Sequence, residues 1–360
     1  MRDAATATMD GLFPDAAFTK HWQQTLAAWY AENGRDLPWR KTKDPYKIWV
    51  SEVILQQTRI VQGTDYYHRF ISRFPTVEAL AAASEEEVLR LWQGLGYYSR
   101  ARNLHTAARQ IEALGTFPKT YSEILSLKGV GEYTAAAVAS IAFGEPRAAV
   151  DGNVYRVLAR QFGIATPIDT TEGKRLFERL AAALVDERHP GRHNQAMMDF
   201  GALQCTPKAP LCQACPFAGM CAARTEGPEH FPVKSRKVKV STRYLIYICA
   251  RAKGQIYLHR RGAGDIWQGL YEPILLEFDH KACLPEITER LPWLKEQTVR
   301  LVAEDMSHVL THRRLLADVY LVELDEAVEM DGYRRVPEEE RGKYAVPRLV
   351  ERIFEVVENS

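Results

Sequence analysis

The hydrophobic pattern of this chain changes its period at about residue 225, and this change limits the possible fold more than any other feature. Before it, apolar residues recur every three or four positions, which is the period of an amphipathic helix. Segments with this pattern lie at 18–30, 47–57, 84–93, 132–143, 150–162, 172–186 and 192–204. After residue 243 the pattern indicates two strands around Gly254, a strand at 315–324 and a final helix at 346–357. The sequence therefore predicts a nearly all-α part followed by an α+β part.

A segment rich in proline, glycine and basic residues separates the two patterns. It reads EGPEHFPVKSRKVKVSTR and has no apolar period, which is typical of a linker. We expect a helical domain at 1–225, a linker at 226–242 and a second domain at 243–360. With 360 residues, 46% of them apolar, the chain can build two cores.

Neither the charge nor the apolar runs of the chain point to a membrane or to a strongly basic surface. The formal net charge is +1, so contact with DNA would depend on locally placed groups such as main-chain amides at helix ends. The longest apolar run, 135–143, is too short to cross a bilayer, and the first residues lack a secretory signal. We expect a cytoplasmic protein.

Four of the six cysteines fall within seventeen residues. They are Cys205, Cys212, Cys215 and Cys221, with the spacing C-x6-C-x2-C-x5-C. In a reducing compartment, clustered thiolates indicate a metal site rather than disulfides. One alternative is a structural zinc site, although zinc ribbons normally use two separate C-x2-C pairs. The other is an iron–sulfur cubane, in which each iron takes one thiolate.

The segment LKGVG lies between two helical patterns and predicts a helical hairpin. Gly129 and Gly131 allow a tight turn and a close approach to another surface. The amides that open the next helix favour an anion such as a phosphate. A plain connection between helices is the alternative, but Gly144 and Pro146 follow, and then Asp151 directly before another helix.

Glu52 is an acid in an otherwise apolar stretch, beside Val53, Ile54 and Leu55. A carboxylate in such a place costs free energy unless it is paired or used. Either an arginine partner or a catalytic role would explain it. An apolar setting would raise the pKa of Glu52 and keep it protonated near neutral pH, as a general acid requires.

Taken in order, these motifs resemble the helix-hairpin-helix DNA glycosylase superfamily and, within it, the adenine DNA glycosylases of the MutY type. The similar segments are LPWR from 37, DPYKIWVSEVILQQTRI from 44, GLGYYSRARNLH from 94, LKGVGEYTAAAVAS from 127, VDGNVYRVLAR from 150, NQAMMDFGALQC from 194 and the four cysteines. The resemblance implies an all-α glycosylase domain whose cysteines hold a [4Fe-4S] cluster, followed by an α+β Nudix-like domain. It also implies base excision repair, in which adenine mispaired with 8-oxoguanine or guanine is flipped out of DNA and cleaved from its sugar.

The resemblance gives catalytic roles to two carboxylates. Cleavage of an N-glycosidic bond needs an acid that neutralises the leaving base and an anion that supports the oxocarbenium-like sugar. Glu52 matches the residue that protonates adenine and then helps to activate water. Asp151, for which a helix cap is the alternative, matches the residue that stabilises the sugar cation. Asn153 matches a position close to the catalytic Asp.

Tyr133 matches a residue that hydrogen-bonds near the catalytic Glu, with a buried core tyrosine as the alternative. In the bifunctional members of the superfamily a nucleophilic Lys occupies this position. Because a phenol cannot form an imine, we do not expect strand cleavage through a Schiff base.

Residues for base recognition carry over from the family in the same way. The positions that match contacts to the extruded adenine are Arg35, Trp39, Arg40, Leu55, Ile60 and Gln195. Among them Trp39 could equally belong to the core. The positions that match contacts to the DNA and the partner base are Gln57, Thr58, Leu95, Tyr97, Gly129, Gly131, His308, Thr311 and His312. Planar and apolar groups would sandwich the flipped base while amide or guanidinium groups read its edge.

The second domain departs most from the family pattern. The Phe-Ser-His loop that reads the oxidised guanine appears here as Leu310, Thr311 and His312. Thr keeps the hydroxyl, whereas Leu removes the aromatic wedge, so the strength of the preference for 8-oxoguanine is open. The segment PEEERG at 337–342 resembles part of a Nudix hydrolase box but lacks the upstream Gly and Glu. We expect it to be an exposed acidic loop without nucleotide hydrolysis.

Three classes of protein are compatible with these patterns. The favoured one is a monomeric adenine glycosylase that acts on DNA with A·8-oxoguanine or A·G mispairs, on the nucleoid of a bacterial cell, with its protein partners unknown. A non-catalytic lesion binder would use the hairpin and the cluster only to hold DNA, and a zinc-binding regulator would use only the cysteines. The presence of both Glu52 and Asp151 favours the enzyme.

Overall fold

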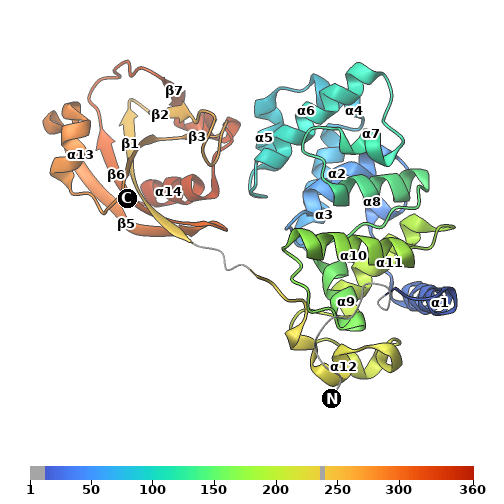
Figure 1. Ribbon diagram of the computed structural model, residues 1–360. Coiled ribbons are helices and arrows are strands. Elements are labelled where there is room, and N and C mark those ends of the chain that lie inside the picture. The colour runs from blue at the N-terminus through green and yellow to red at the C-terminus, as the bar shows by residue number, and fades with distance from the viewer. Residues whose placement is uncertain (1–12, 236–239) are drawn as a thin grey trace. The chain divides into compact units, whose positions relative to one another are not determined.

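The computed structural model describes residues 13–235 and 240–360 of the chain (Figure 1). Helices dominate the chain before residue 230, and a sheet dominates the chain after residue 240, as the change of period predicts. None of the helices in the described ranges combines the length and the apolar character that a membrane span requires.

The chain forms two compact units that are not continuous in sequence. The first consists of Met1–Glu78 and Thr106–Lys237, and the second of Ala79–His105 and Val238–Ser360. The second unit therefore includes the segment Ala79–His105 of the domain predicted at 1–225.

The first unit is built from helices. Its α-helices are α1 (Ala16–Asn33), α2 (Pro45–Leu55), α3 (Ile60–Arg73), α7 (Tyr121–Leu125), α8 (Glu132–Phe143), α9 (Gly152–Phe162), α10 (Thr171–Leu184), α11 (Pro190–Asp199) and α12 (Ala223–Glu226). Its short helical turns are η2 (Pro38–Arg40), η3 (Phe200–Gln204), η4 (Cys212–Ala214), η5 (Ala218–Met220) and η6 (Pro228–His230). The turn η3 is π-helical and continues α11, so the helix predicted at 192–204 changes its winding at Phe200.

Helix caps fix where the functional helices begin. The Asp44 carboxylate accepts hydrogen bonds from the main-chain amides of Tyr46 and Lys47 and so starts α2. Asp151 caps α9 in the same way. Helix α8 lies between Gly131 and Gly144, and Gly144 ends it in the left-handed conformation at φ 75°.

The core of the first unit lies between α1, α9, α10 and α11. Its largest fully buried side chains include those of Trp22, Phe177, Phe200 and Phe217. Helices α2 and α8 pack against each other and are apolar on nearly all sides, so both lie inside the unit. This packing places Glu52, on α2, at a buried position.

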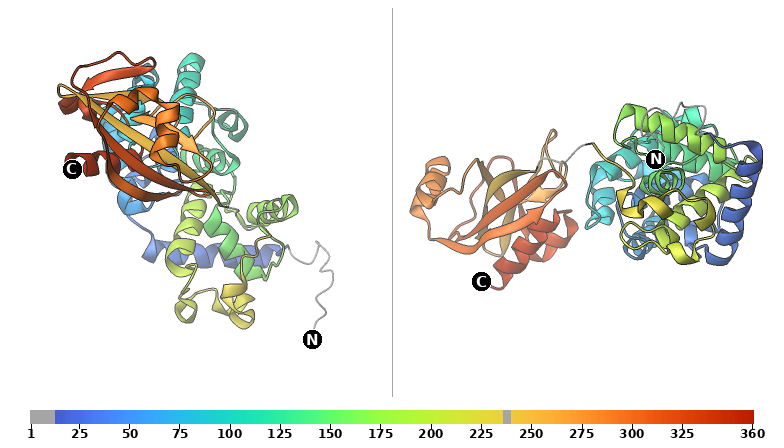
Figure 2. Two further views of the ribbon diagram at one scale, coloured as in Figure 1. Left: turned by 90° about the vertical axis from the view of Figure 1, so that its left-hand side faces the viewer. Right: turned by 60° about the horizontal axis from the view of Figure 1, so that its bottom comes forward.

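The second unit contains a seven-stranded sheet with helices on both faces (Figure 2). The strands are β1 (Ser241–Ala252), β2 (Gln255–Arg260), β3 (Tyr271–Glu272), β4 (Ile274–Phe278), β5 (Val299–Val309), β6 (Arg313–Glu323) and β7 (Tyr333–Pro337). The main order is β3-β2-β1-β6-β5, with β4 paired to β1 and β7 to β2. Strands β1 and β6 run parallel, while the other pairs are antiparallel.

The helices of the second unit cover its two apolar layers. Helix α14 (Arg348–Glu358) packs on one face of the sheet, and α13 (Leu284–Arg290) and η7 (Pro292–Glu296) pack on the other. Helix α5 (Glu85–Trp92) also belongs to this unit, whereas α4 (Val77–Ala82) and α6 (Ser99–Leu114) contribute residues to both units.

Two local predictions in the second unit have different outcomes. The turn around Gly254 is present, because Lys253 and Gly254 both adopt positive φ, 49° and 74°, as a two-residue hairpin requires. The segment 337–342, expected as an exposed loop, instead contains a 3-10 helix, η8 (Glu338–Lys343). An ion pair of 2.6 Å between Lys343 Nζ and Glu340 Oε1, one turn apart, supports this helix.

Candidate active site

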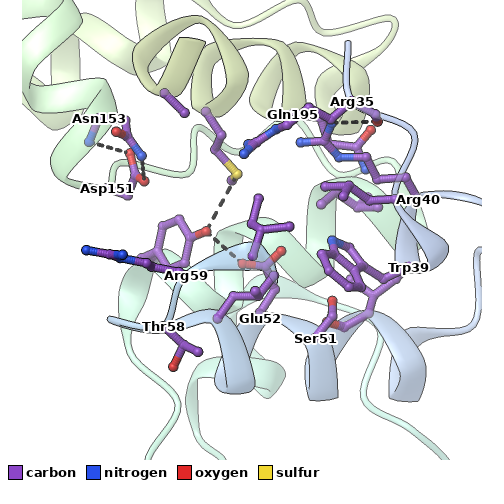
Figure 3. Close-up of a pocket in the computed structure, with 18 residues that line it drawn as sticks. Arg35, Trp39, Arg40, Ser51, Glu52, Thr58, Arg59, Asp151, Asn153 and Gln195 are labelled. Atoms are coloured by element: carbon purple, nitrogen blue, oxygen red, sulfur yellow. Dashed lines mark hydrogen bonds between the residues drawn. The ribbon is translucent and has the colours of Figure 1, made fainter. Parts of the chain in front are cut away.

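A cavity of about 300 Å³ in the first unit is lined by all of the predicted catalytic and adenine-binding residues (Figure 3). The four predicted catalytic residues line it: Glu52, Tyr133, Asp151 and Asn153. So do all six predicted adenine contacts: Arg35, Trp39, Arg40, Leu55, Ile60 and Gln195. Among the predicted DNA contacts, Thr58 also lines this cavity. The walls come from α2, α8, α9 and α11, which are far apart in sequence.

Glu52 is buried, with 7% of its surface exposed. Burial is the largest influence on its pKa and raises it, and the negative charge of Asp151 acts in the same direction. A hydrogen bond of 2.7 Å from the Tyr133 hydroxyl to Glu52 Oε2, together with the charge of Arg40, opposes these effects. The net pKa is raised, which favours a protonated carboxyl that can act as an acid.

Asp151 serves both as a helix cap and as a wall of the cavity. Its Oδ1 accepts hydrogen bonds from the amides of Asn153, at 2.9 Å, and Val154, at 2.8 Å. Its Oδ2 accepts one from Asn153 Nδ2, at 2.8 Å. The net pKa of Asp151 is raised, because burial outweighs these hydrogen bonds and the charge of Arg156, which lower it. The three donors stabilise the charged form and aim the carboxylate from the start of α9.

A buried ion-pair network holds the two predicted arginines. The carboxylate of Asp199, whose side chain is 0% exposed, accepts hydrogen bonds from Arg40 Nη1, at 2.6 Å, and Arg40 Nη2, at 2.7 Å. It also accepts from the main-chain amide and Nε of Arg35, at 2.9 and 2.8 Å. The guanidinium groups are therefore fixed donors at the cavity wall. We did not predict Asp199, although it lies in the segment NQAMMDFGALQC.

Two other predicted adenine contacts, Gln195 and Trp39, are each held by an aromatic residue. The Tyr30 hydroxyl donates to Gln195 Oε1 at 3.3 Å. Trp39 is 5% exposed and packs edge-on against Tyr67, with ring centres 5.2 Å apart, so it belongs to the core and also lines the cavity. Residues that line the cavity without having been predicted include Ser51, Arg59 and Met198.

The predicted hairpin is formed by α7, the turn that contains Gly129, and α8. Gly129 has φ 75°, which explains the preference for glycine there. Gly131 precedes α8 and has no side-chain cap, so the first amides of α8 stay available to a ligand. Gln57 lies in the connection from α2 to α3, is exposed and also has a positive φ of 57°.

A second cavity, of about 660 Å³, lies in the second unit and collects the remaining predicted lesion contacts. These are Leu95, Tyr97, His308, Thr311 and His312. Leu310 and Trp267 line the same cavity. The hydroxyl groups of Tyr97 and Thr311 are hydrogen-bonded to each other. Most of the predicted contacts therefore lie in one group around the first cavity and another around the second, whereas Gln57, Gly129 and Gly131 line neither.

The four clustered cysteines face one small cavity, of about 30 Å³, between α9 and the turns that follow η3. Arg160 donates to Cys205 Sγ at 3.4 Å, and Cys221 Sγ donates to the carbonyl of Arg160 at 3.4 Å. Over the described ranges, no three His, Cys, Asp or Glu side chains converge closely enough to hold a single metal ion. Four thiols around a common space are the donor set that a [4Fe-4S] cluster uses, one for each iron.

Arg156 connects the cysteine loop to the cavity. Its Nε donates to the carbonyl of Cys205 at 2.8 Å, and its Nη2 donates to Asn153 Oδ1 at 2.9 Å and to the carbonyl of Gly201 at 2.6 Å. Asn153 in turn holds Asp151. Two side chains, those of Arg156 and Asn153, thus connect the cysteine loop to the Asp151 carboxylate.

Two family matches agree with this architecture. Residues 50–183 match the HhH-GPD superfamily of base excision DNA repair proteins, and residues 245–356 match the NUDIX domain. A solved thermostable thymine-DNA glycosylase has a TM-score of 0.54 and 31% identity, covering 59% of this chain and 100% of its own. Endonuclease III in a trapped covalent DNA intermediate, at TM-score 0.51 and 22% identity, covers 59% of this chain and 99% of its own and shares the fold. Fold and site thus define a base excision DNA glycosylase of the helix-hairpin-helix class.

Curated relatives narrow this class. The rat adenine DNA glycosylase is 34% identical over 96% of this chain and 80% of the rat protein. That of Buchnera aphidicola from Acyrthosiphon pisum is 32% identical over 81% of this chain and 84% of its own. The chain belongs to the adenine DNA glycosylases of the MutY type. It is thus a base excision repair enzyme that removes adenine from DNA by hydrolysing an N-glycosidic bond.

Proposed function

We propose that this enzyme excises adenine mispaired with 8-oxoguanine or guanine, and that it does so without cleaving the DNA strand. The observation that carries the proposal is that Glu52 and Asp151 line one cavity from two different helices. Around them stand Arg40, Trp39 and Gln195, which suit a planar base with polar edges.

Burial raises the pKa of both carboxylates, but their hydrogen-bond donors differ: the Tyr133 hydroxyl donates to Glu52, whereas three N–H groups donate to Asp151 and favour its charged form. Glu52, with its raised pKa, gives a proton to the departing adenine, so that the base leaves neutral. Asp151, held by the amides of Asn153 and Val154, faces the positive charge that develops on the sugar. After the base has left, the ionised Glu52 accepts a proton from the water that attacks the sugar.

The residues of the cavity support a monofunctional reaction. A lyase of this superfamily needs an amine to form an imine with the sugar, and position 133 carries a phenol instead. The residues that line the cavity, all of them within the described part of the chain, include no lysine. The product is then an abasic site in an intact strand.

The second cavity supports recognition of the partner base. The Thr311 hydroxyl and the imidazoles of His308 and His312 line it and can meet the polar edge of an oxidised guanine. We assign this cavity to the base opposite adenine, and the DNA duplex that carries the mispair is the partner of the enzyme.

We further propose that Cys205, Cys212, Cys215 and Cys221 hold a [4Fe-4S] cluster. When bound, such a cluster ties the loop that follows η3 and supplies no step of the hydrolysis. Brown protein with about four irons per chain is expected. Colourless protein with one zinc per chain would support the structural zinc site instead.

A single-turnover excision assay tests the catalytic proposal. Duplexes with A·8-oxoguanine, A·G and A·T pairs are compared, and strand breaks are counted before and after alkali. We expect excision in the order A·8-oxoguanine, A·G, A·T, with breaks only after alkali. Equal excision from A·8-oxoguanine and A·G would refute the lesion preference, and prompt breaks by pure enzyme would refute the monofunctional reaction.

A further inference from the structure

The walls of the second cavity differ in polarity and in aromatic character. The recognition loop contributes Leu310, Thr311 and His312, which are one aliphatic and two polar side chains. A purine also needs a flat surface, and stacking of a base on an aromatic ring is a major part of its binding by proteins. Tyr97 and Tyr98 also line the cavity, from the segment Ala79–His105, and in the part of this unit after residue 240 the large aromatic side chain at the cavity is that of Trp267. It comes from a different loop, which connects β2 to β3.

Trp267 is held firmly in its place. Its φ is 63°, a left-handed conformation that a bulky residue adopts only when its surroundings impose it. The carbonyl of Trp267 accepts a hydrogen bond of 3.0 Å from the amide of Leu270. Arg261 Nε donates to the neighbouring carbonyl of Ile266 at 2.9 Å, and its guanidinium carbon lies 5.9 Å from the Trp267 ring centre.

An ion-pair network around Asp265 holds the same loop in place. Asp265, two residues before Trp267, accepts hydrogen bonds from Arg243 at 2.7 and 2.8 Å, from Arg261 at 2.7 Å and from Arg313 at 3.0 Å. Arg243 lies on β1 and Arg313 on β6, while Arg261 directly follows β2 and belongs to the same loop as Asp265. The loop is thus tied to two strands and braced within itself, and its tryptophan can serve as a rigid wall rather than a mobile flap.

Trp267 also lies next to His308, the polar side chain that would hydrogen-bond to the oxidised edge of the guanine. The ring of His308 stands at 66° to that of Trp267, with centres 5.8 Å apart. Burial, reinforced by the charge of Arg352, lowers the pKa of His308, so its ring is neutral at pH 7 and keeps one acceptor nitrogen. Oxidation of guanine at C8 adds a hydrogen-bond donor at N7 and an acceptor at O8. A base lying on Trp267 would direct this edge toward acceptors and donors of the cavity.

We propose that Trp267 is a specificity-determining residue, whose indole forms the aromatic wall against which an 8-oxoguanine base packs in the second cavity. Leu310, at the position where the family has Phe, cannot offer an aromatic face, and Trp267 provides one from the opposite loop. The inference rests on the proposed function, since it presumes that this cavity receives the base opposite adenine.

Two substitutions at this position and one control test the proposal. Trp267→Leu removes the aromatic face and keeps an apolar side chain, and Trp267→Phe keeps a smaller ring. Trp293→Leu is the control, because Trp293 is a half-buried tryptophan of the same unit that packs on the other face of the sheet. The readout is the ratio of single-turnover excision rates on A·8-oxoguanine and A·G duplexes.

We expect Trp267→Leu to lower this ratio about tenfold, as loss of one base–aromatic stack does. The rate of Trp267→Leu on the A·G duplex should stay within about twofold of the wild-type rate. The ratios measured for Trp267→Phe and for Trp293→Leu should also stay within about twofold of the wild-type ratio, because neither variant loses a base–aromatic stack. If Trp267→Leu kept the wild-type ratio of the two excision rates, the role of Trp267 would be refuted, while the proposed function of the enzyme would stand. Equal loss on both duplexes would refute this role too, because it would show a structural role instead. A wild-type enzyme without any preference would overturn the proposed lesion recognition as well.

Discussion

The Tyr133 hydroxyl donates a hydrogen bond of 2.7 Å to Oε2 of Glu52. This bond stabilises the ionised form of Glu52, whereas burial and the charge of Asp151 stabilise the protonated form. Burial is the largest of these influences, so the pKa of Glu52 lies above the usual value for a glutamate. The pair therefore sets the pH at which Glu52 loses the proton that adenine would receive.

The substitution Tyr133→Phe should move the pH dependence of excision. Without the hydroxyl, the ionised Glu52 loses a donor, its pKa rises further, and the alkaline decline of the single-turnover rate shifts to higher pH. A hydrogen bond to a charged group contributes about 1.5–3 kcal/mol, which corresponds to a shift of about one pH unit or more. A decline that moves to lower pH would contradict the assignment of Glu52 as the acid.

The substitution Glu52→Gln should lower the excision rate by a factor of about 10²–10⁴, the usual contribution of a general acid or base. Duplex binding, measured by the dissociation constant for A·8-oxoguanine DNA, should change far less. A Glu52→Gln enzyme that excised adenine at the wild-type rate would instead favour a protein in which this carboxylate serves only the fold.

The same substitution should also change how stability depends on pH. The pKa of Glu52 is higher in the folded protein than in the unfolded chain, so between the two values the folded state binds more protons. The stability that protonated Glu52 contributes is fully present below its pKa in the unfolded chain. It is lost as the pH rises through its pKa in the folded protein. The glutamine of Glu52→Gln does not titrate, so this variant lacks that loss of stability. Its melting temperature minus that of the wild type should therefore increase from pH 4 to pH 8. A constant difference would exclude the raised pKa.

The buried carboxylate of Asp199 should be essential for the stability of the first unit. Burial alone would raise the pKa of Asp199, but hydrogen bonds from Arg40 and Arg35 lower it overall. Asp199→Asn leaves both guanidinium groups without a counter-charge, and breaking a buried ion pair costs about 3–5 kcal/mol. Urea denaturation should show this loss in the free energy of unfolding, together with slower adenine excision.

Asp36→Asn is the matched control for that experiment. Asp36 also pairs with a basic residue, Lys41, but their side chains are 77% and 65% exposed. An exposed pair contributes about 0–1 kcal/mol. Equal destabilisation by the two substitutions would show that the Asp199 network has no special role.

The parts of the fold that were predictable are those that depend on neighbours in sequence. The helix expected at 132–143 is confirmed as α8, because apolar residues fill it and Gly131 and Gly144 bound it. The helix expected at 150–162 begins two residues later, at Gly152, since Asp151 takes the capping position. The cluster of four cysteines and the hairpin were recognisable because their residue types and spacing are local features.

The parts that were not predictable depend on residues far apart in sequence. The Asp199 network joins positions 159 and 164 residues apart, so no local pattern distinguishes this Asp from an exposed one. Placing Ala79–His105 with the C-terminal part likewise follows from packing and not from the hydrophobic period. Trp267 was missed for the same reason, since its loop meets His308 only through the fold of the sheet.

The close approach of η3 to α9 gives a last prediction, for Gly201. A Cβ atom added at Gly201 would lie 2.5 Å from the Cβ of Asn153, and the carbonyl of Gly201 also accepts a hydrogen bond from Arg156. Gly201→Ala should therefore push Asn153 away from Asp151. Overpacking of this kind costs about 1–3 kcal/mol of stability, and the excision rate should fall because Asp151 loses its side-chain donor.

Gly152→Ala separates this effect from a general intolerance of alanine near the site. Gly152 is the first residue of α9 and adjoins Asp151, but an added Cβ there would meet no atom within 4 Å. We expect Gly152→Ala to keep the wild-type stability and rate, whereas Gly201→Ala loses both. If Gly201→Ala behaved like Gly152→Ala, the contact between η3 and Asn153 would not control the position of Asp151, and the alignment of this carboxylate would have to come from its two main-chain donors alone.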